Sequence, residues 1–198
     1  MRVVAIDMRG FGKSPEMEYP YSLDDYANEV KEILDFLGEP RVNVIAHSFG
    51  ARVIIRLAKQ DKRIDKIVFT GAAGLKPRRS LKYFLKKASF FILKRFVKRE
   101  KLKFLYSEDY RNLSEVKKKS FQKIVSDYLE KDLTEIESDC LLVFGKRDKE
   151  TPSYMARKMK RLLKRANLTF MDGCGHFCFV QKPEQFNGIA FKFLMGNG

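Results

Sequence analysis

Apolar residues along the chain follow two different spacings. Short apolar runs of about four residues, which are typical of buried parallel strands, occur at residues 3–6, 42–46, 66–69, 141–144 and 168–171. Elsewhere apolar residues recur every three or four positions, as on the buried side of an amphipathic helix, over residues 22–37, 50–58, 81–96, 116–129, 153–163 and 183–194. Strands that alternate with helices in this way predict an α/β fold with a mostly parallel sheet flanked by helices.

Local signals mark the ends of the first helix and the limits of an insertion. Ser22 suits an N-cap, Asp25 stands at the third helical position, and Gly38 follows the last apolar position. Further along, a helical stretch at residues 75–134 interrupts the alternation of strands and helices. We interpret it as an insertion over the carboxyl edge of the sheet, so that residues 1–74 and 135–198 form the core.

The composition suits a single domain with a small insertion. The chain has 198 residues, of which 44% are apolar, and its three cysteines are too few for a disulfide scaffold, so we expect free thiols. No run approaches the roughly 20 apolar residues that span a membrane. Asp7 interrupts the first apolar run before the core of a secretory leader could form. We therefore expect a cytoplasmic protein.

The net charge of +15 belongs mainly to one segment. Residues 75–125 hold 17 basic and 4 acidic side chains, a net +13, whereas the rest of the chain carries only +2. Such a segment can contact nucleic acid or an anionic membrane surface, but it can also be the solvated face of a helix. We favour the solvated face and expect no nucleic-acid partner, and we keep the anionic membrane surface as the weaker alternative.

The sharpest chemical signal is the sequence Ala46-His47-Ser48-Phe49-Gly50, which falls between a predicted strand and a predicted helix. A nucleophilic serine needs a tight strand-to-helix turn that exposes its hydroxyl group. Small residues two positions before and after the serine permit this turn, because bulk there would collide with neighbouring elements. The motif therefore makes Ser48 a candidate nucleophile.

A serine hydroxyl becomes a good nucleophile only when a base takes its proton. The chain has two histidines, and His47 directly precedes Ser48, so its side chain is expected to point elsewhere. His176, in a glycine-rich loop after the last predicted strand, is the candidate base, and Asp148, after the penultimate strand, is the candidate that orients it. Three other aspartates lie too close to the base along the chain or at the opposite edge of the sheet: Asp172, Asp65 and Asp139.

Four motifs in this order resemble the α/β-hydrolase superfamily, in particular its small esterases, lipases and carbon–carbon bond hydrolases that carry a helical cap. The motifs occupy residues 7–14, 46–50, 144–152 and 173–184. The resemblance implies that Ser48 is the nucleophile, His176 the general base and Asp148 its orienting acid. It also implies that the backbone N–H of Phe49 stabilises the oxyanion, and that residues 75–134 form the cap.

The function implied by the resemblance is hydrolysis of an ester-like small substrate through an acyl-enzyme, without a metal ion or an organic cofactor. The favoured scissile bond is that of a carboxylester, a thioester or a lactone, but it stays open because the family also includes carbon–carbon bond hydrolases. The expected partner is a small apolar acyl-type substrate. The cap helix at residues 81–96 either buries its apolar face on the sheet edge or lines an acyl pocket. The side chains expected at this pocket are His47, Phe84, Phe91 and Phe177.

The chain departs from the family at its amino end. In the family, the motif at residues 7–14 normally follows an earlier strand whose exit carries a His-Gly pair and supplies a second oxyanion donor. That strand would lie between residues 3–6 and 42–46, so two strands would lack their shared neighbour. We favour a truncated gene product over a degenerate member. The alternative function is a non-catalytic fragment or binding module whose basic segment contacts acidic surfaces.

Overall fold

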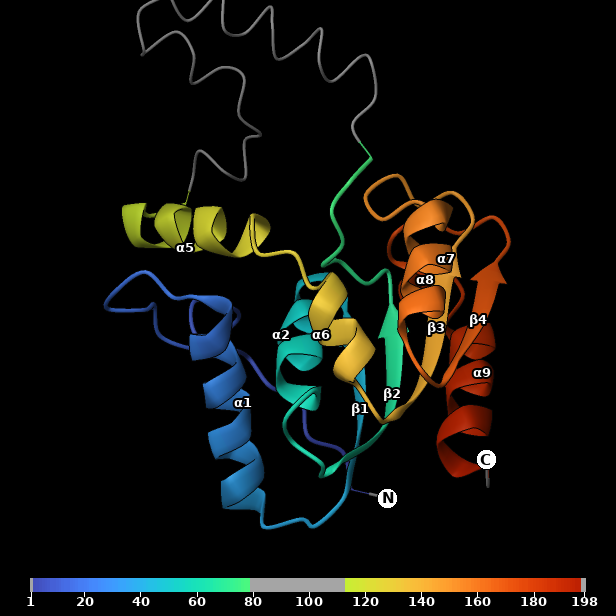
Figure 1. The fold of residues 1–198 in the computed structure, drawn as a ribbon, viewed down its shortest axis with the longest axis horizontal. Helices are drawn as coiled ribbons and strands as arrows, with labels where there is room; N and C mark the ends of the chain where they lie inside the picture. The colour runs from blue at the N-terminus through green and yellow to red at the C-terminus, as the bar shows by residue number, and fades with distance from the viewer. Residues whose placement is uncertain (1, 79–112, 197–198) are drawn as a thin grey trace, which may run out of the picture.

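The computed structural model describes residues 2–78 and 113–196, and it contains one parallel sheet with helices on both sides (Figure 1). Strands β1 to β4 are Val42–His47, Ile64–Thr70, Asp139–Gly145 and Ala166–Met171, and they lie side by side in chain order. The described helices are α1 (Leu23–Leu37), α2 (Ser48–Ala58), α5 (Glu115–Val125), α6 (Glu130–Glu135), α7 (Ser153–Leu162), α8 (Cys178–Gln181) and α9 (Pro183–Met195). The predicted α/β fold is confirmed, and no helix among the described residues is long and apolar enough to cross a membrane.

Alternate residues of the strands form two hydrophobic clusters, one on each face of the sheet. On one face, Ile67, Phe69 and Leu142 are fully buried among residues of α1, α2, α6 and α7. On the other face, Val68 and Val143 are fully buried beside α8 and α9. Figure 1 shows α2 and α6 on one side of the sheet and α9 on the other. The central strands β2 and β3 are thus covered on both faces, which explains their continuous apolar sequences.

The boundaries of α1 follow the predicted capping signals. The Ser22 hydroxyl accepts a hydrogen bond from the Asp25 N–H (3.3 Å), and the Asp25 carboxylate accepts one from the Ser22 N–H (2.7 Å). This reciprocal pair satisfies two backbone donors that the first turn of a helix leaves unpaired. Gly38 ends the helix in the left-handed conformation with a φ of 66°. Helix α1 therefore begins and ends where the sequence indicates.

Part of the segment predicted as a cap packs in the main core. The helix predicted at residues 116–129 corresponds to α5, which ends earlier, at Val125, and α6 begins after it at Glu130. Leu129 and Leu133 are fully buried in the larger cluster. Arg52 of α2 donates to the backbone oxygens of Ile124 (3.0 Å) and Asp127 (2.9 Å). Helix α2 therefore holds the turn between α5 and α6 by charge-assisted hydrogen bonds.

The apolar run at residues 3–6 is not a strand, contrary to the prediction. Val3 and Val4 are 77% and 47% exposed, and residues 2–7 are outside the sheet. Strand β1 is one of the two terminal strands of the described sheet, and its Ile45 is 53% exposed. A strand requires a neighbour that pairs with its backbone N–H and C=O groups, and no described strand pairs with residues 3–6. The apolar run therefore stays on the surface.

We expect Arg52→Leu to lower the free energy of unfolding by about 2 kcal/mol, because two backbone oxygens lose a charged donor and a buried side chain loses its packing. Urea unfolding followed by circular dichroism measures the change. Arg41→Leu is the matched control: Arg41 forms an exposed ion pair with Asp65 (2.6 Å), and its loss should cost less than about 1 kcal/mol. Equal stability of the two variants would contradict the role given to Arg52.

Candidate active site

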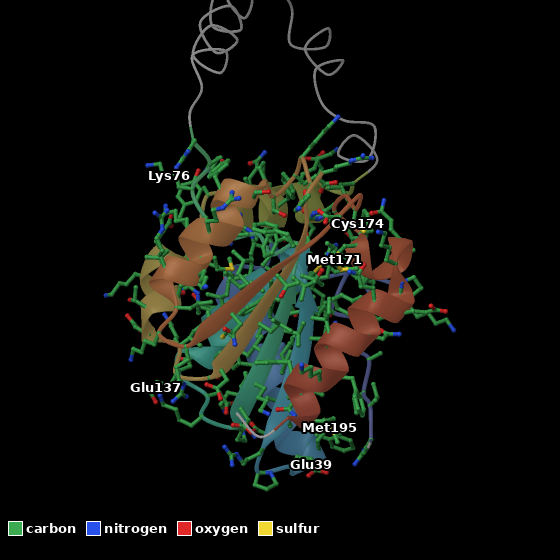
Figure 2. The ribbon with its side chains drawn as sticks, turned by 90° about the vertical axis from the view of Figure 1, so that its right-hand side faces the viewer. Glu39, Lys76, Glu137, Met171, Cys174 and Met195 are labelled. Atoms are coloured by element: carbon green, nitrogen blue, oxygen red, sulfur yellow. The ribbon has the colours of Figure 1, made fainter. Side chains whose placement is uncertain are left out.

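The loops that follow the four strands meet at the carboxyl edge of the sheet. Figure 2 shows Met171, the last residue of β4, and Cys174 at one end of the sheet, and Glu39 and Glu137, which precede β1 and β3, at the other. In open parallel sheets ligands bind outside the carboxyl ends of the strands. One residue of interest follows each strand in turn: Ser48, Gly71, Asp148 and His176.

Ser48 occupies the turn between β1 and α2. It is the only non-glycine residue with a positive φ (46°) among those that the structure describes. A left-handed backbone costs about 1–2 kcal/mol for a residue that carries a Cβ atom, and strain of this kind gathers at functional sites. The backbone at Ser48 thus has the strained strand-turn-helix geometry expected of an exposed nucleophile.

The neighbours of this turn agree with the sequence analysis except at one glycine. Ala46 is buried, as a tight turn requires. A Cβ atom added to Gly50 would meet no described atom within 4 Å, so steric crowding does not explain this glycine, contrary to the prediction. The Phe49 ring stacks on Phe11 (5.2 Å between ring centroids) and meets Tyr26 edge-on (5.1 Å). Its N–H lies in the first turn of α2, where backbone donors lack intrahelical partners and no side chain caps the helix.

Asp148 and His176 are joined by a buried hydrogen bond. The Nδ1–H of His176 donates to Asp148 Oδ2 (2.8 Å). Asp148 also accepts from the backbone N–H groups of Glu150 and Thr151 (both 2.9 Å) and from the Thr151 hydroxyl (2.7 Å). Burial acts to raise the pKa of Asp148, but the hydrogen bonds from His176 and Thr151 outweigh it, and the pKa is lowered. The carboxylate is therefore ionised at neutral pH.

The second ring nitrogen of His176 faces a different carboxylate. Its Nε2 lies 3.4 Å from Oε2 of Glu150, whose side chain is 66% exposed. Ser48 and His176 both lie in the described part of the chain, and no hydrogen bond joins them there. The structure therefore brings Asp148 and His176 into contact and puts Ser48 at the same edge of the sheet, without a direct bond between the serine and the imidazole.

His47 lies against His176 rather than away from the site. The two ring centroids are 4.6 Å apart, and the His47 ring also meets Phe177 (5.1 Å) and Phe179 (4.9 Å). Its Nδ1 is 3.0 Å from the backbone oxygen of Thr70, which can only accept, so Nδ1 carries the proton. Burial and the neighbouring His176 lower the pKa of His47. His47 is thus a neutral part of the wall around His176.

Three residues of the site were missed by sequence reasoning. Gly71 has a φ of 50°, and a Cβ atom there would lie 3.0 Å from the His176 ring and 3.1 Å from the His47 ring. A glycine directly after a strand was its only signal in the sequence. Glu150 and Thr151 follow Asp148 in the same loop; both lie within the motif at residues 144–152, but neither was expected from the sequence to have a role in the site. Phe84 and Phe91, expected at the pocket, lie outside the described residues.

Two cavities lie away from this group of side chains. One of about 380 Å³ lies between residues 6–15 and α1, and one of about 680 Å³ lies between α9 and the amino-terminal parts of β3 and β4. Within residues 2–78 and 113–196, no cluster of three His, Cys, Asp or Glu side chains is placed to hold a metal ion. The three cysteines, Cys140, Cys174 and Cys178, are buried free thiols.

Comparison with known proteins identifies relatives along the whole chain. A family model described as the alpha/beta hydrolase family matches residues 1–189. The chain is 23% identical over 224 residues to the AB hydrolase superfamily protein YisY of Bacillus subtilis, covering 97% of the chain and 81% of that protein. It is 24% identical over 225 residues to 2-hydroxy-6-oxononadienedioate/2-hydroxy-6-oxononatrienedioate hydrolase 2 of Pseudomonas putida, covering 98% and 77%.

Solved structures share the fold at low sequence identity. The esterase EaEST from Exiguobacterium antarcticum superimposes with a TM-score of 0.73 at 20% identity, covering 96% of this chain and 80% of that one. The meta-cleavage product hydrolase from Pseudomonas fluorescens has a TM-score of 0.68 at 21% identity, covering 94% and 77%. At these identities the likeness shows the fold alone. Because the family model spans nearly the whole chain, the protein belongs to the alpha/beta hydrolase family.

Proposed function

We propose that the protein is a serine hydrolase that cleaves an ester-like bond in a small substrate through an acyl-enzyme. One observation carries the proposal: a serine in a strained left-handed turn shares a sheet edge with a histidine that is hydrogen-bonded to a buried carboxylate (2.8 Å). Membership of the family supports a hydrolytic role, and one relative of known structure is an esterase.

In the first half of the reaction, Ser48 Oγ attacks the carbonyl carbon of the substrate while its proton passes to His176 Nε2. The carbonyl electron pair moves onto the oxygen, and the backbone N–H of Phe49 stabilises the resulting oxyanion. When the carbonyl reforms, the bond to the leaving group breaks, and the protonated Nε2 gives its proton to the leaving atom. The acyl group then remains as an ester on Ser48.

In the second half, water takes the place of the leaving group. His176 Nε2 accepts a proton from the attacking water, and the same nitrogen returns that proton to Ser48 Oγ as the acid departs. Asp148 keeps Nδ1 protonated throughout, so that Nε2 is the nitrogen that exchanges protons. Its negative charge also stabilises the imidazolium that forms in each half-reaction, and burial strengthens that attraction.

The surroundings of His176 support a small substrate with an apolar acyl group. Phe177 and Phe179 lie beside the His47 ring, and the Phe177 side chain is half-exposed to solvent. Neutral His47 adds no charge to this wall. An uncharged carboxylester, thioester or lactone suits such surroundings, because an apolar acyl group gains by leaving water while a charged one would lose its hydration.

Ser48→Ala should abolish covalent labelling by a fluorophosphonate probe and reduce hydrolysis of p-nitrophenyl acetate by at least about 10³-fold, because the atom that takes the acyl group is removed. In-gel fluorescence and release of p-nitrophenol measure the two effects. Ser126→Ala, at an exposed serine after α5, is the control and should label like the wild type. A folded wild-type chain that takes no label would favour the non-catalytic binding module instead.

Gly71→Ala should slow labelling by at least about 10-fold and lower the free energy of unfolding by about 1–2 kcal/mol, because a positive φ is costly with a Cβ atom and both histidine rings would have to shift. Labelling rates and urea unfolding are measured on the same preparation. Gly188→Ala in α9 is the matched control, since a Cβ atom there meets no described atom within 4 Å. Unchanged labelling of Gly71→Ala would show that this contact does not position the histidines.

A further inference from the structure

His176 has a carboxylate at each of its two ring nitrogens. Asp148 is 2.8 Å from Nδ1, and Glu150 is 3.4 Å from Nε2. Both acids come from the loop after β3, two residues apart. The Asp148 side chain is fully buried, whereas that of Glu150 is 66% exposed. The ring is therefore held between one buried acid and one acid that reaches it from solvent.

A carboxylate at Nε2 favours the wrong protonation state for a general base. An ionised carboxylate can only accept hydrogen bonds, so its contact with Nε2 is strongest when that nitrogen carries a proton. Nδ1 already carries a proton for Asp148, so a proton on Nε2 makes the ring an imidazolium. An imidazolium has no lone pair left to accept the proton of Ser48. The contact with Glu150 thus opposes the first step of the proposed reaction.

We propose that Glu150 is a positioning residue that holds Nε2 of His176 in the substrate-free protein and must leave this nitrogen before Ser48 can transfer its proton. The inference rests on the proposed function, because it assigns Nε2 to proton transfer. It assigns Glu150 a role that the family resemblance does not imply: Glu150 orients the ring from the second side.

The structure makes Glu150, and not Asp148, the acid that can move. Asp148 accepts four hydrogen bonds and is enclosed, whereas the Glu150 carboxylate forms its one described ion pair with His176 Nε2. The main chain of Glu150 is fixed, since its N–H donates to Asp148 (2.9 Å). Rotation of the exposed side chain alone would release Nε2, and a substrate seated at Ser48 would compete for the same position.

Few other charged groups face the ring in the described part of the chain. His47 approaches from the end of β1 at 4.6 Å, and burial lowers its pKa, so it is neutral at neutral pH. Gly71 after β2 and Phe177 in the loop of His176 bear no charge, and the Thr151 hydroxyl lies 3.5 Å from Nδ1. Asp148 and Glu150 are therefore the two described charges in contact with the ring.

The test compares the wild type with Glu150→Gln by two readouts. The first is the pH midpoint of the His176 ring, followed by NMR on protein labelled with ¹⁵N-histidine; His47→Phe assigns the two histidines. At the dielectric constant of bulk water, which the 66% exposed Glu150 side chain approaches, charges 3.4 Å apart attract by an energy equal to about one pH unit. We expect the midpoint to fall by about one unit in Glu150→Gln and by less in Glu150→Asp, which keeps the charge on a shorter side chain.

The second readout is the rate of fluorophosphonate labelling as a function of pH. One unit below the wild-type midpoint, Glu150→Gln should label about five-fold faster, because more of its His176 is unprotonated. Glu39→Gln removes one acid at the opposite end of the sheet (Figure 2) and is the control for net charge. It should leave both the midpoint and the labelling rate at the wild-type values.

The outcomes separate this inference from the proposed function. A midpoint that is the same in the wild type and in folded Glu150→Gln overturns the role of Glu150, even if Ser48 is labelled normally. A lowered midpoint in a protein that takes no label supports the contact of Glu150 with Nε2 and overturns the serine hydrolase proposal. A lowered midpoint together with faster labelling at low pH supports both.

Discussion

The hydrogen bond between Asp148 and His176 is the interaction on which the rest of the candidate site depends. It joins the loop after β3 to the loop after β4, and both residues are almost completely buried. An ionised carboxylate at such a position is costly unless donors surround it. Glu150 and Thr151 supply three of those donors, and the imidazole supplies the fourth. The hydrogen bonds to the Asp148 carboxylate thus determine both the shape of the loop after β3 and the orientation of the His176 ring.

The strained turn at Ser48 depends on support from parts of the chain far from it in sequence. The ring of Phe49 lies between Phe11, from the loop at residues 9–15, and Tyr26, from α1. Tyr26 is almost fully buried, and its hydroxyl donates to the backbone oxygen of Arg9 (3.1 Å). Ring packing at the residue after the serine, against a tyrosine that is itself held by a hydrogen bond, therefore offsets the cost of the left-handed backbone at Ser48. The turn at residues 46–50 thus depends on tertiary contacts as much as on its own five residues.

The features that could be predicted from the sequence are those with a local cause. The capping box at Ser22, the strands buried on both faces and the order of Ser48, Asp148 and His176 at one sheet edge all follow from patterns within a few residues. The failures have non-local causes. Residues 3–6 have the sequence of a strand but no described neighbour to pair with, and Gly71 is required by two histidines that come from distant loops. The contact of Glu150 depends on a side-chain direction that no pattern records.

The candidate nucleophile follows a strand at the edge of the described sheet. Strand β1 is terminal, and Ile45 is half-exposed, whereas β3, which leads to Asp148, is covered on both faces. The last residue of β1 is nevertheless bonded to β2. His47 pairs with Thr70 in the ladder, and the His47 Nδ1–H donates to the backbone oxygen of Thr70 (3.0 Å). This bond fixes the residue directly before Ser48 to the end of β2, which stands between β1 and β3. The position of the serine relative to the His–Asp pair therefore depends on β2 rather than on the open edge of β1.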